Sequence, residues 1–598
     1  MANAPGAAFG GDFDGKVLDR YWVRLALLAW VLIAGYYLYE RWPQMRFLAL
    51  PDTDDNMRLM QVRGLLNGQG WYDLRQHRMN SPLGFDIHWS RLVDLPIAGL
   101  ILLLKPFVGT VWAERAACWI APLLPLSIAI LGLGATVRRL VSPVAWPLAI
   151  VFLIGCTATM LMFMPERIDH HGWQLAMLSL TVAGLADPKG ARGGITVGLA
   201  SAVSLTIGLE MLPFCAGAGA IIALRWVWDR AEAPRMSAYA LTLAGGSTLG
   251  FAAFASEANR VLRCDALTPV WLSVMIAAGA LLFILARIGP EKRAVRLILA
   301  VLAGAAIVVG FALVFPQCLG RPEQVSPELA KNWLNNVREA KPIYQHPLRS
   351  AFPIATLPII GVIGAAVATW RARRTPRMIG WVAVLLFTTF AALMLLWQMR
   401  AGPGAQLLAV PGAVALGWII FPRLLASKIM LVRVVGTVVA FLIVSGLFAG
   451  YAIQYLPIDR PSARVNTINK ASGNCSANYA LRPLDRYPAQ TVFTFVDLGP
   501  RLITLTHHDA IAGPYHRNGP AILDVQHGFG GTPENFRAIA RRHGATLLLV
   551  CPNMAESTVY RSRNKGGFYD QLAHNEVPAF LEPLPLPDKS PLRLFRIN

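Results

Sequence analysis

Residues 297–315 read LILAVLAGAAIVVGFALVF, a run of nineteen residues with no charged side chain. A helix needs roughly 20 mostly apolar residues to cross the hydrocarbon core of a bilayer, so this run is long enough to span a membrane. Similar stretches recur along the chain. Including the quoted one, they start near residues 21, 112, 143, 172, 193, 212, 237, 270, 294, 351, 378, 405 and 434. The sequence therefore predicts a polytopic α-helical membrane protein with about thirteen spans.

The overall composition leads to the same class. The 598 residues are 55% hydrophobic and 15% charged, with a mean hydropathy of +0.47. Soluble globular chains carry about 25% charged residues, so this chain is too apolar for that class. Its formal net charge of +21 comes from basic residues spread over many loops and not gathered on one soluble module. We therefore expect no nucleic-acid partner.

The distribution of Lys and Arg predicts the orientation, because these residues concentrate in cytoplasmic loops. Most of them follow the even-numbered spans: Arg138 and Arg139; Lys189 and Arg192; Arg225, Arg230 and Arg235; Arg287, Lys292, Arg293 and Arg296; Arg371, Arg373, Arg374 and Arg377; and Arg423, Lys428 and Arg433. The short loops of opposite parity hold only Arg167, Arg260, Arg263 and Arg400. This bias predicts a cytoplasmic N-terminus and, with an odd number of spans, a C-terminal segment on the other side.

The first apolar stretch follows Lys16 and Arg20. It is too long for the core of a signal peptide and is not followed by a convincing small-residue cleavage site, so we expect a retained anchor. The predicted location is the bacterial inner membrane, with the residues after Tyr455 in the periplasm.

Four of the seven cysteines fall on the predicted outer side, and the other three fall inside predicted spans. An oxidising compartment favours disulfides. We expect the pairs Cys264 with Cys318 and Cys475 with Cys551; the alternative is four free thiols.

Three polar stretches interrupt the apolar pattern, and all three are extracytoplasmic in this topology. They define a membrane domain, residues 1–456, with outer loops 41–111 and 316–350, and a soluble domain, residues 457–598. In the soluble domain, Thr491–Asp497 and Ala545–Cys551 have the pattern of buried strands, and Pro533–Gly544 that of a helix. This order predicts a small α/β domain.

The first outer loop contains an acidic cluster, Asp52, Asp54 and Asp55, in the sequence PDTDDNMRLM. Three carboxylates within four residues repel one another unless a cation, a proton donor or a substrate shares them. The cluster is therefore a candidate catalytic base or metal site. The alternative is a helix N-terminus, where acids cap the backbone and complement the helix dipole.

A second candidate site lies in MPERIDHHGWQ, between the third and fourth predicted spans. Asp169, His170 and His171 fall in a short outer loop there. Such residues can bind a metal through oxygen and nitrogen, and a purely structural role is the alternative.

These two motifs resemble those of the catalytic subunit of oligosaccharyltransferases, membrane glycosyltransferases of the GT-C type. That family also has thirteen spans, a cytoplasmic N-terminus and an outer C-terminal domain. The similar stretches are Asp54–Arg63, Gly68–Tyr72, Ser81–Gly84 and Asp169–Gln174. The matching first-loop acid is either Asp52 or Asp54. The resemblance implies that a sugar or glycan moves from a polyprenyl-linked donor to an acceptor at the outer face of the membrane.

The chain departs from the family in two places. Gln174 stands where the family motif ends in Glu, and the tail lacks the W-W-D motif that reads an asparagine sequon. We therefore do not expect N-glycosylation of a protein sequon. The expected acceptor is a glycan, a lipid, an exported polymer or a protein, and membrane lipid is a further expected partner.

Glycosyl transfer from a lipid phosphate needs a base, a cation for the departing phosphate, and an apolar groove. Asp52, Asp54 and Asp55, with Asp169, are the candidate catalytic acids, and Asp54 with Asp169 the candidate ligands for a divalent cation such as Mg²⁺ or Mn²⁺. Arg400, at the outer end of the eleventh span, is the candidate phosphate ligand, as the family places an Arg there. The other candidate substrate-binding residues are Arg58, His170, His171 and Glu210.

Two further polar segments have less specific sequences. Glu323 or Glu328 of the second long loop, Gly320–Pro347, would correspond to an acid of the family's mobile loop. Histidines at 507, 508, 516 and 527 of the tail are interpreted mainly as structural hydrogen-bonding residues.

Two other functions remain open from the sequence. A transporter or flippase of lipid-linked glycans would use Glu210 and the outer acids as a translocation path. A non-catalytic assembly partner would use the tail as a binding module.

Overall fold

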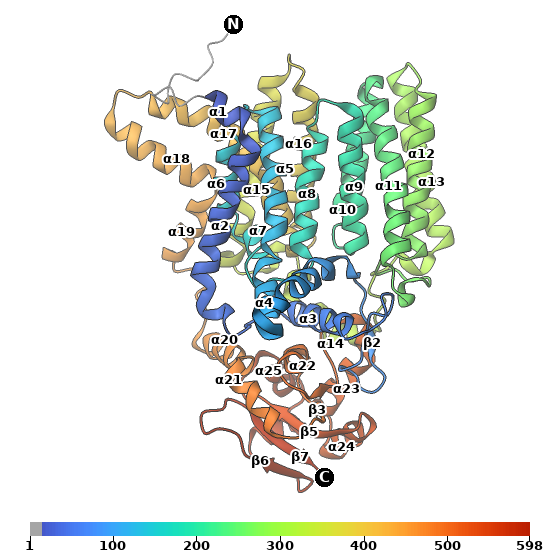
Figure 1. Cartoon of the computed structure of the whole chain (residues 1–598), viewed down its shortest axis with the longest axis vertical. Helices are drawn as coiled ribbons and strands as arrows, with labels where there is room; N and C mark the ends of the chain where they lie inside the picture. Colours follow the sequence, from blue (N-terminus) through green and yellow to red (C-terminus); the bar gives the residue numbers. More distant parts are fainter. Residues whose placement is uncertain (1–14) are drawn as a thin grey trace.

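The computed structural model describes residues 15–598. It consists of a bundle of long helices with a mixed α/β domain at one end, and Figure 1 shows α1 and this C-terminal domain at opposite ends of the bundle. Helices α3 and α4 lie between the bundle and the domain.

A helix occupies each region where an apolar stretch was expected. The bundle helices are α1 (Gly15–Arg20), α2 (Trp22–Met45), α5 (Leu123–Leu140), α6 (Trp146–Gly155), α7 (Thr157–Leu161), α8 (His171–Leu185), α9 (Gly190–Ile207), α10 (Leu212–Trp228), α11 (Ala233–Phe254), α12 (Pro269–Ile288), α13 (Arg293–Val314), α15 (Leu348–Ala372), α16 (Met378–Met394), α17 (Gly402–Leu425), α18 (Thr437–Val444) and α19 (Leu447–Tyr455). Within the described residues, six helical stretches are individually long and apolar enough to cross a membrane. The helical segments Val432–Val444 and Leu447–Tyr455, which are bent relative to each other, would make a seventh if they form one span. The count of thirteen spans stays a prediction.

One boundary differs from the prediction. The second span was expected to start near residue 112, but residues up to Ile120 belong to α4 (Asp94–Ile120), which is interrupted at Gly109 with a φ of 75°. The next bundle helix starts at Leu123. The outer segment is therefore longer than the apolar pattern indicates, because α4 is itself rich in apolar residues.

Small residues allow some bundle helices to approach closely. A Cβ added at Gly364 would lie 2.0 Å from the carbonyl oxygen of Gly412, and one added at Gly412 would lie 2.0 Å from that of Gly361. Helices α15 and α17 are therefore in backbone contact. In lipid, such close packing replaces the hydrophobic driving force that operates in water.

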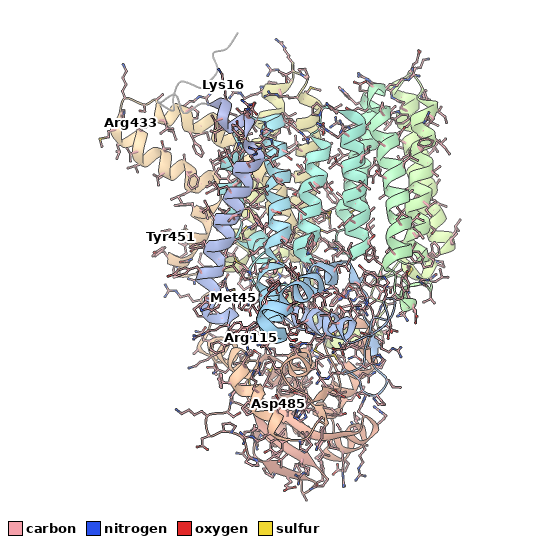
Figure 2. The ribbon with its side chains drawn as sticks, viewed as in Figure 1. Lys16, Met45, Arg115, Arg433, Tyr451 and Asp485 are labelled. Atoms are coloured by element: carbon pink, nitrogen blue, oxygen red, sulfur yellow. A yellow bond between two sulfur atoms is a disulfide. The ribbon has the colours of Figure 1, made fainter. Side chains whose placement is uncertain are left out.

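The side chains labelled in Figure 2 agree with the predicted separation of the two ends. Lys16 and Arg433 lie at the end of the bundle remote from the C-terminal domain, whereas Met45 and Arg115 lie near the domain. Arg433 belongs to a loop predicted to be cytoplasmic, so the basic loops and the domain fall at opposite ends.

The C-terminal domain contains a five-stranded sheet in the order β4-β3-β5-β7-β6. Strand β3 (Thr491–Phe493) is parallel to β4 (Asp509–Ala510) and β5 (Ala545–Val550), and β7 (Arg593–Ile597) is antiparallel to β5 and β6 (Leu581–Leu584). The helices are α20 (Ala463–Cys475), α21 (Asn478–Leu481), α22 (Gly499–Leu505), α23 (Gly519–Gly530), α24 (Pro533–Arg542), α25 (Ala555–Arg563) and α26 (Phe568–Ala573). Both predicted strands and the predicted helix are therefore confirmed, although β3 ends four residues earlier than expected.

Both expected disulfides are present. Cys264 bonds Cys318 with a Cα separation of 5.4 Å, and Cys475 bonds Cys551 with a Cα separation of 6.1 Å. The remaining cysteines, Cys118, Cys156 and Cys215, are buried and free.

Arg78 is one of the residues that attach the first outer segment to the C-terminal domain. This segment contains α3 (Thr53–Leu66), β1 (Arg75–Gln76) and β2 (Phe85–Asp86). The Arg78 guanidinium donates to the carbonyl oxygens of Ile503, Thr506 and His508 at 2.6–2.9 Å and to Asp509 Oδ1 at 3.1 Å. The next contact is a hydrogen bond from the Asn80 N–H to the Ala510 carbonyl at 2.9 Å.

We expect Arg78→Ala to loosen this attachment, because three carbonyl groups lose their donor and each unsatisfied group costs about 1–3 kcal/mol. Hydrogen exchange should accelerate at residues 503–510 and 76–80. Arg75→Ala is the matched control, since Arg75 is exposed and pairs only within the same loop, with Asp86. Equal exchange in both variants would contradict the role of Arg78.

Candidate active site

The acidic cluster begins at the N-terminus of α3. Asp52 is the N-cap residue: its Oδ1 accepts the Thr53 N–H at 2.6 Å, and its own N–H donates to Asp55 Oδ2 at 3.1 Å. This reciprocal arrangement is a capping box, with Asp55 in the position usually held by Glu or Gln. The capping interpretation is therefore correct for Asp52 and Asp55.

Arg167, from the loop between α7 and α8, joins the two acidic motifs. Its Nη1 lies 2.7 Å from Asp52 Oδ2 and 3.3 Å from Asp55 Oδ2, and its Nη2 lies 2.5 Å from Asp169 Oδ2. The Asp169 N–H also donates to Asp55 Oδ1 at 3.0 Å. One guanidinium thus neutralises carboxylates from segments more than a hundred residues apart in the sequence.

The backbone before Arg167 is strained. Glu166 has a φ of 73°, a conformation that side chains other than glycine rarely adopt. Its N–H donates to the Cys118 carbonyl at 2.9 Å, which fixes the loop to the end of α4. Such strain occurs where the surrounding structure determines a side-chain position, and here it directs the next residue into the acidic cluster.

Asp54 is the acid of this cluster that remains without a partner. Its carboxylate makes no hydrogen bond or ion pair with any residue between 15 and 598, and the residue is partly exposed. Desolvation and the negative charges of Asp52 and Asp169 raise the pKa of Asp54 to about 7. A carboxyl group with this pKa can accept a proton near neutral pH.

Asp169 has the opposite electrostatic environment. Burial would raise its pKa, but His171 and Arg167 hold the pKa of Asp169 well below its usual range. His171 Nδ1 lies 3.3 Å from Asp169 Oδ2, and the His171 N–H donates to Asp169 Oδ1 at 2.9 Å. Asp169 is therefore a permanent negative charge beside Asp54.

A second polar cluster surrounds Glu210, between α9 and α10. His170 Nε2 lies 3.2 Å and His88 Nε2 lies 3.8 Å from Glu210 Oε1, and Gln174 Nε2 donates to Glu210 Oε2 at 3.0 Å. The departure at Gln174 has a physical reason here, because a Glu at this position would face Glu210 and repel it. His88 was not identified from the sequence, as no motif marks it.

Arg58 is a buried residue that contacts the second cluster through His170. It is fully buried, with its Nη1 2.7 Å from Asp94 Oδ1 and its Nη2 3.4 Å from His170 Nδ1. It also lies over the Trp89 ring at 4.8 Å. The expected direct contact with substrate is therefore not supported: Arg58 positions the first loop and His170.

Arg400 lies between α16 and α17, as expected, and pairs with Glu339 at 2.9 Å. Glu339 belongs to the second long loop and contributes to the electrostatic environment of Asp54 and His171. Of the two acids expected from this loop, Glu323 forms no ion pair among the described residues, and Glu328 pairs with His527 of the C-terminal domain at 2.6 Å. A role for either acid at the site stays a prediction.

The tail histidines have the structural contacts expected of them. His507 and His508 lie at 2.7 and 2.9 Å from the carbonyl oxygens of Tyr487 and Leu484. His516 Nε2 lies 2.6 Å from Asp265 Oδ2.

The proposed metal pair, Asp54 and Asp169, does not form a metal site in this arrangement. Among residues 15–598, no three His, Cys, Asp or Glu side chains converge as a metal would require. The Asp169 carboxylate is already shared by Arg167 and His171, so a cation there would have to displace the guanidinium. We derive no step through a metal ion.

We expect Arg167→Gln to destabilise the folded chain, because the buried carboxylates at 55 and 169 lose their counterion. Removing one partner of a buried pair costs about 3–5 kcal/mol. The acids become protonated in the variant as the pH falls, so the decrease in unfolding temperature should be largest near about pH 8 and smaller near about pH 5. Arg338→Gln removes an exposed, unpaired charge on the same side and is the control. A pH-independent deficit, or one equal to the control, would contradict the shared-counterion arrangement.

Comparison with known proteins gives a likeness in structure but not in sequence. No protein-family model matches the chain, and no curated protein matches it. The structure superposes on the oligosaccharyltransferase AglB of Archaeoglobus fulgidus, solved with an inhibitory peptide and a dolichol-phosphate, with a TM-score of 0.66, 15% identity and coverage of 95% of this chain and 73% of that one. For the A. fulgidus enzyme tethered to an acceptor peptide the TM-score is 0.65, with the same identity and coverage. For its complex with Zn and sulfate, the TM-score is 0.56, at 14% identity over 89% of this chain and 67% of that one. The chain therefore shares the fold of this archaeal oligosaccharyltransferase.

Proposed function

We propose that this chain is a membrane glycosyltransferase. It transfers a sugar or glycan from a polyprenyl phosphate or pyrophosphate donor to an envelope acceptor at the outer face of the inner membrane. The observation that carries the proposal is the environment of Asp54: a carboxylate without a partner among residues 15–598, with a pKa of about 7 and the charge of Asp169 acting on it. It belongs to α3, which lies between the bundle and the C-terminal domain (Figure 1).

The proposed topology has the N-terminus in the cytoplasm and the C-terminal domain in the periplasm. Its support is the excess of Lys and Arg in the loops at the end remote from the domain. The two disulfides are on the domain side, which agrees with an oxidising compartment. All acids discussed above are then extracytoplasmic.

In this proposal Asp54 is the general base. It takes the proton of the acceptor while the acceptor oxygen bonds the anomeric carbon of the donor sugar, and the bond from that carbon to the phosphate oxygen breaks. Asp52 is unsuited to this role because it caps α3 and pairs with Arg167. Asp55 is unsuited because it is fully buried and shares the same guanidinium.

The donor phosphate is proposed to bind Arg400. A guanidinium binds phosphate in a bidentate manner, and the Nε of Arg400 is buried without a hydrogen-bond partner. Glu339 accepts a hydrogen bond from the Nη2 of the same guanidinium. A phosphate bound in a bidentate manner would therefore displace the Glu339 carboxylate. The charges of His171 and Glu339 both act on Asp54, so the proposed base and the proposed phosphate position share one electrostatic environment. Glu210, His170 and His88 are proposed to bind sugar hydroxyls.

The acceptor is proposed to be a glycan, a lipid or an exported polymer. The A. fulgidus enzyme was solved with an acceptor peptide carrying an N-V-T sequon. The tail of this chain lacks the W-W-D motif expected of a sequon reader, so we propose a different acceptor on the same fold.

We expect Asp54→Asn to reduce the transfer rate by at least about 100-fold, because general bases contribute about 10²–10⁴-fold. The measured rate is the release of labelled sugar from a polyprenyl phosphate donor, in membranes that contain the purified chain. Asp52→Asn is the matched control: it also removes one negative charge, and it should retain most of the activity, because Asn still caps the helix and only the salt bridge to Arg167 is lost. Retention of more than a tenth of the rate by Asp54→Asn, with Asp52→Asn inactive, would reverse the assignment.

A further inference from the structure

A cavity of about 660 Å³ lies in the C-terminal domain between α20 on one side and α25 and α26 on the other. The disulfide Cys475–Cys551 and a hydrogen bond from the Ala555 N–H to Ser472 Oγ at 3.2 Å hold these walls together. Its volume is in the range of small-molecule sites, about 300–1,000 Å³. None of the residues assigned to the candidate active site lines it.

The lining carries an excess of positive charge. Arg464, Arg561 and Lys565 face one carboxylate, Asp570. Arg561 lies 3.5 Å from Asp570, so this acid is already occupied. Arg464 and Lys565 are exposed and form no hydrogen bond or ion pair with any residue from 15 to 598. Two cations on opposite walls are therefore free to bind an anion.

The rest of the lining is mainly polar. It consists of the hydroxyls of Thr467, Ser557, Thr558 and Ser562, the amide of Asn553, the aliphatic Ile468 and the imidazole of His574, which lies 3.6 Å from Asp570. Ligand pockets for apolar molecules are lined mainly by hydrophobic and aromatic side chains. Hydroxyl and charged groups predominate here, so the cavity suits a ligand with many hydroxyl groups and a negative charge.

The cavity also lies close to the proposed outer surface of the membrane. The link that leaves α19 is fixed to the start of α15: Arg349 donates to the carbonyl oxygens of Gln454, Leu456 and Ile458, and Asp459 accepts the Leu348 N–H. Arg464 follows Asp459 by five residues, which span at most about 18 Å when extended. Figure 1 accordingly shows α20 at the side of the domain next to the bundle.

We propose that this cavity binds an acidic saccharide, a sugar ring that bears a phosphate or carboxylate group, as part of the acceptor. Arg464 and Lys565 bind the acidic group, and the hydroxyl and amide side chains bind the sugar hydroxyls. The description of this saccharide as an acceptor rests on the proposed function, but its binding does not.

The test measures binding to the whole purified chain by calorimetry, without turnover. The probes are glucose 6-phosphate and glucuronic acid, with glucose and inorganic phosphate as comparators. We expect at least one acidic sugar to bind about tenfold more tightly than glucose or phosphate. The double variant Arg464→Ala, Lys565→Ala should weaken this binding at least about tenfold, equivalent to about 1.4 kcal/mol. The control, Arg541→Ala with Lys589→Ala, removes two exposed cations of the same domain that do not line the cavity, and it should bind normally.

Three results would overturn the proposal. The first is no binding of either acidic sugar, and the second is an equal loss in both double variants, which would indicate a general charge effect. The third comes from vesicles of phosphatidylcholine with and without phosphatidylglycerol. If only the anionic vesicles compete with the sugar for the chain, and this competition is lost in the cavity variant, the cavity binds a lipid headgroup. Because turnover is not measured, failure of Asp54 as the base would leave this result unaffected.

Discussion

The outer half of this protein depends on one guanidinium. Arg167 contacts carboxylates of Asp52, Asp55 and Asp169 within 3.3 Å. Two of these acids are almost fully buried, and isolated buried carboxylates would be protonated or would destabilise the fold. The arginine therefore joins the first outer segment to the loop before α8. It also distinguishes the acids from one another, since Asp54 is left outside its reach and retains a carboxylate that can exchange protons near neutral pH.

The C-terminal domain and the first outer segment form one unit around this cluster. Arg78 and Arg501 donate from opposite partners: Arg78 of the first segment binds carbonyls of the domain, and Arg501 of the domain binds Leu48 O and Asn56 Oδ1 of the first segment. Tyr515 adds a hydrogen bond to the Thr53 carbonyl at 2.9 Å, one residue before Asp54. The domain thus helps to hold the catalytic candidate.

Much of the fold could be predicted from the sequence because its signals are local. Apolar runs located the bundle helices, the excess of Lys and Arg separated its two ends, and the resulting topology paired Cys264 with Cys318 and Cys475 with Cys551 correctly. The start of the second span was misplaced, since an apolar helix outside the bundle has the same composition as a span.

The site could be predicted only as a set of segments. Asp52, Asp54 and Asp55 have the same chemistry in sequence, and what separates them is a cap and an arginine from a distant loop. Glu339 and His88 lie in unremarkable sequence and become relevant only through tertiary contact, as does the reason for Gln174.

The central claim is that Asp54, the clustered acid that Arg167 does not contact, exchanges a proton near neutral pH. Infrared difference spectroscopy of the carboxyl stretch across a pH titration tests it directly, with the signal of Asp54 taken as the difference between the wild-type chain and Asp54→Asn. Glu166 also has a pKa raised to about 7, so the Asp54 signal is the part of the titration that Asp54→Asn removes. The account predicts that this part titrates near pH 7 in the wild type, is missing in Asp54→Asn, and moves to lower pH in Asp52→Asn, where a neighbouring negative charge is gone. A titration that is unchanged in Asp54→Asn would contradict it.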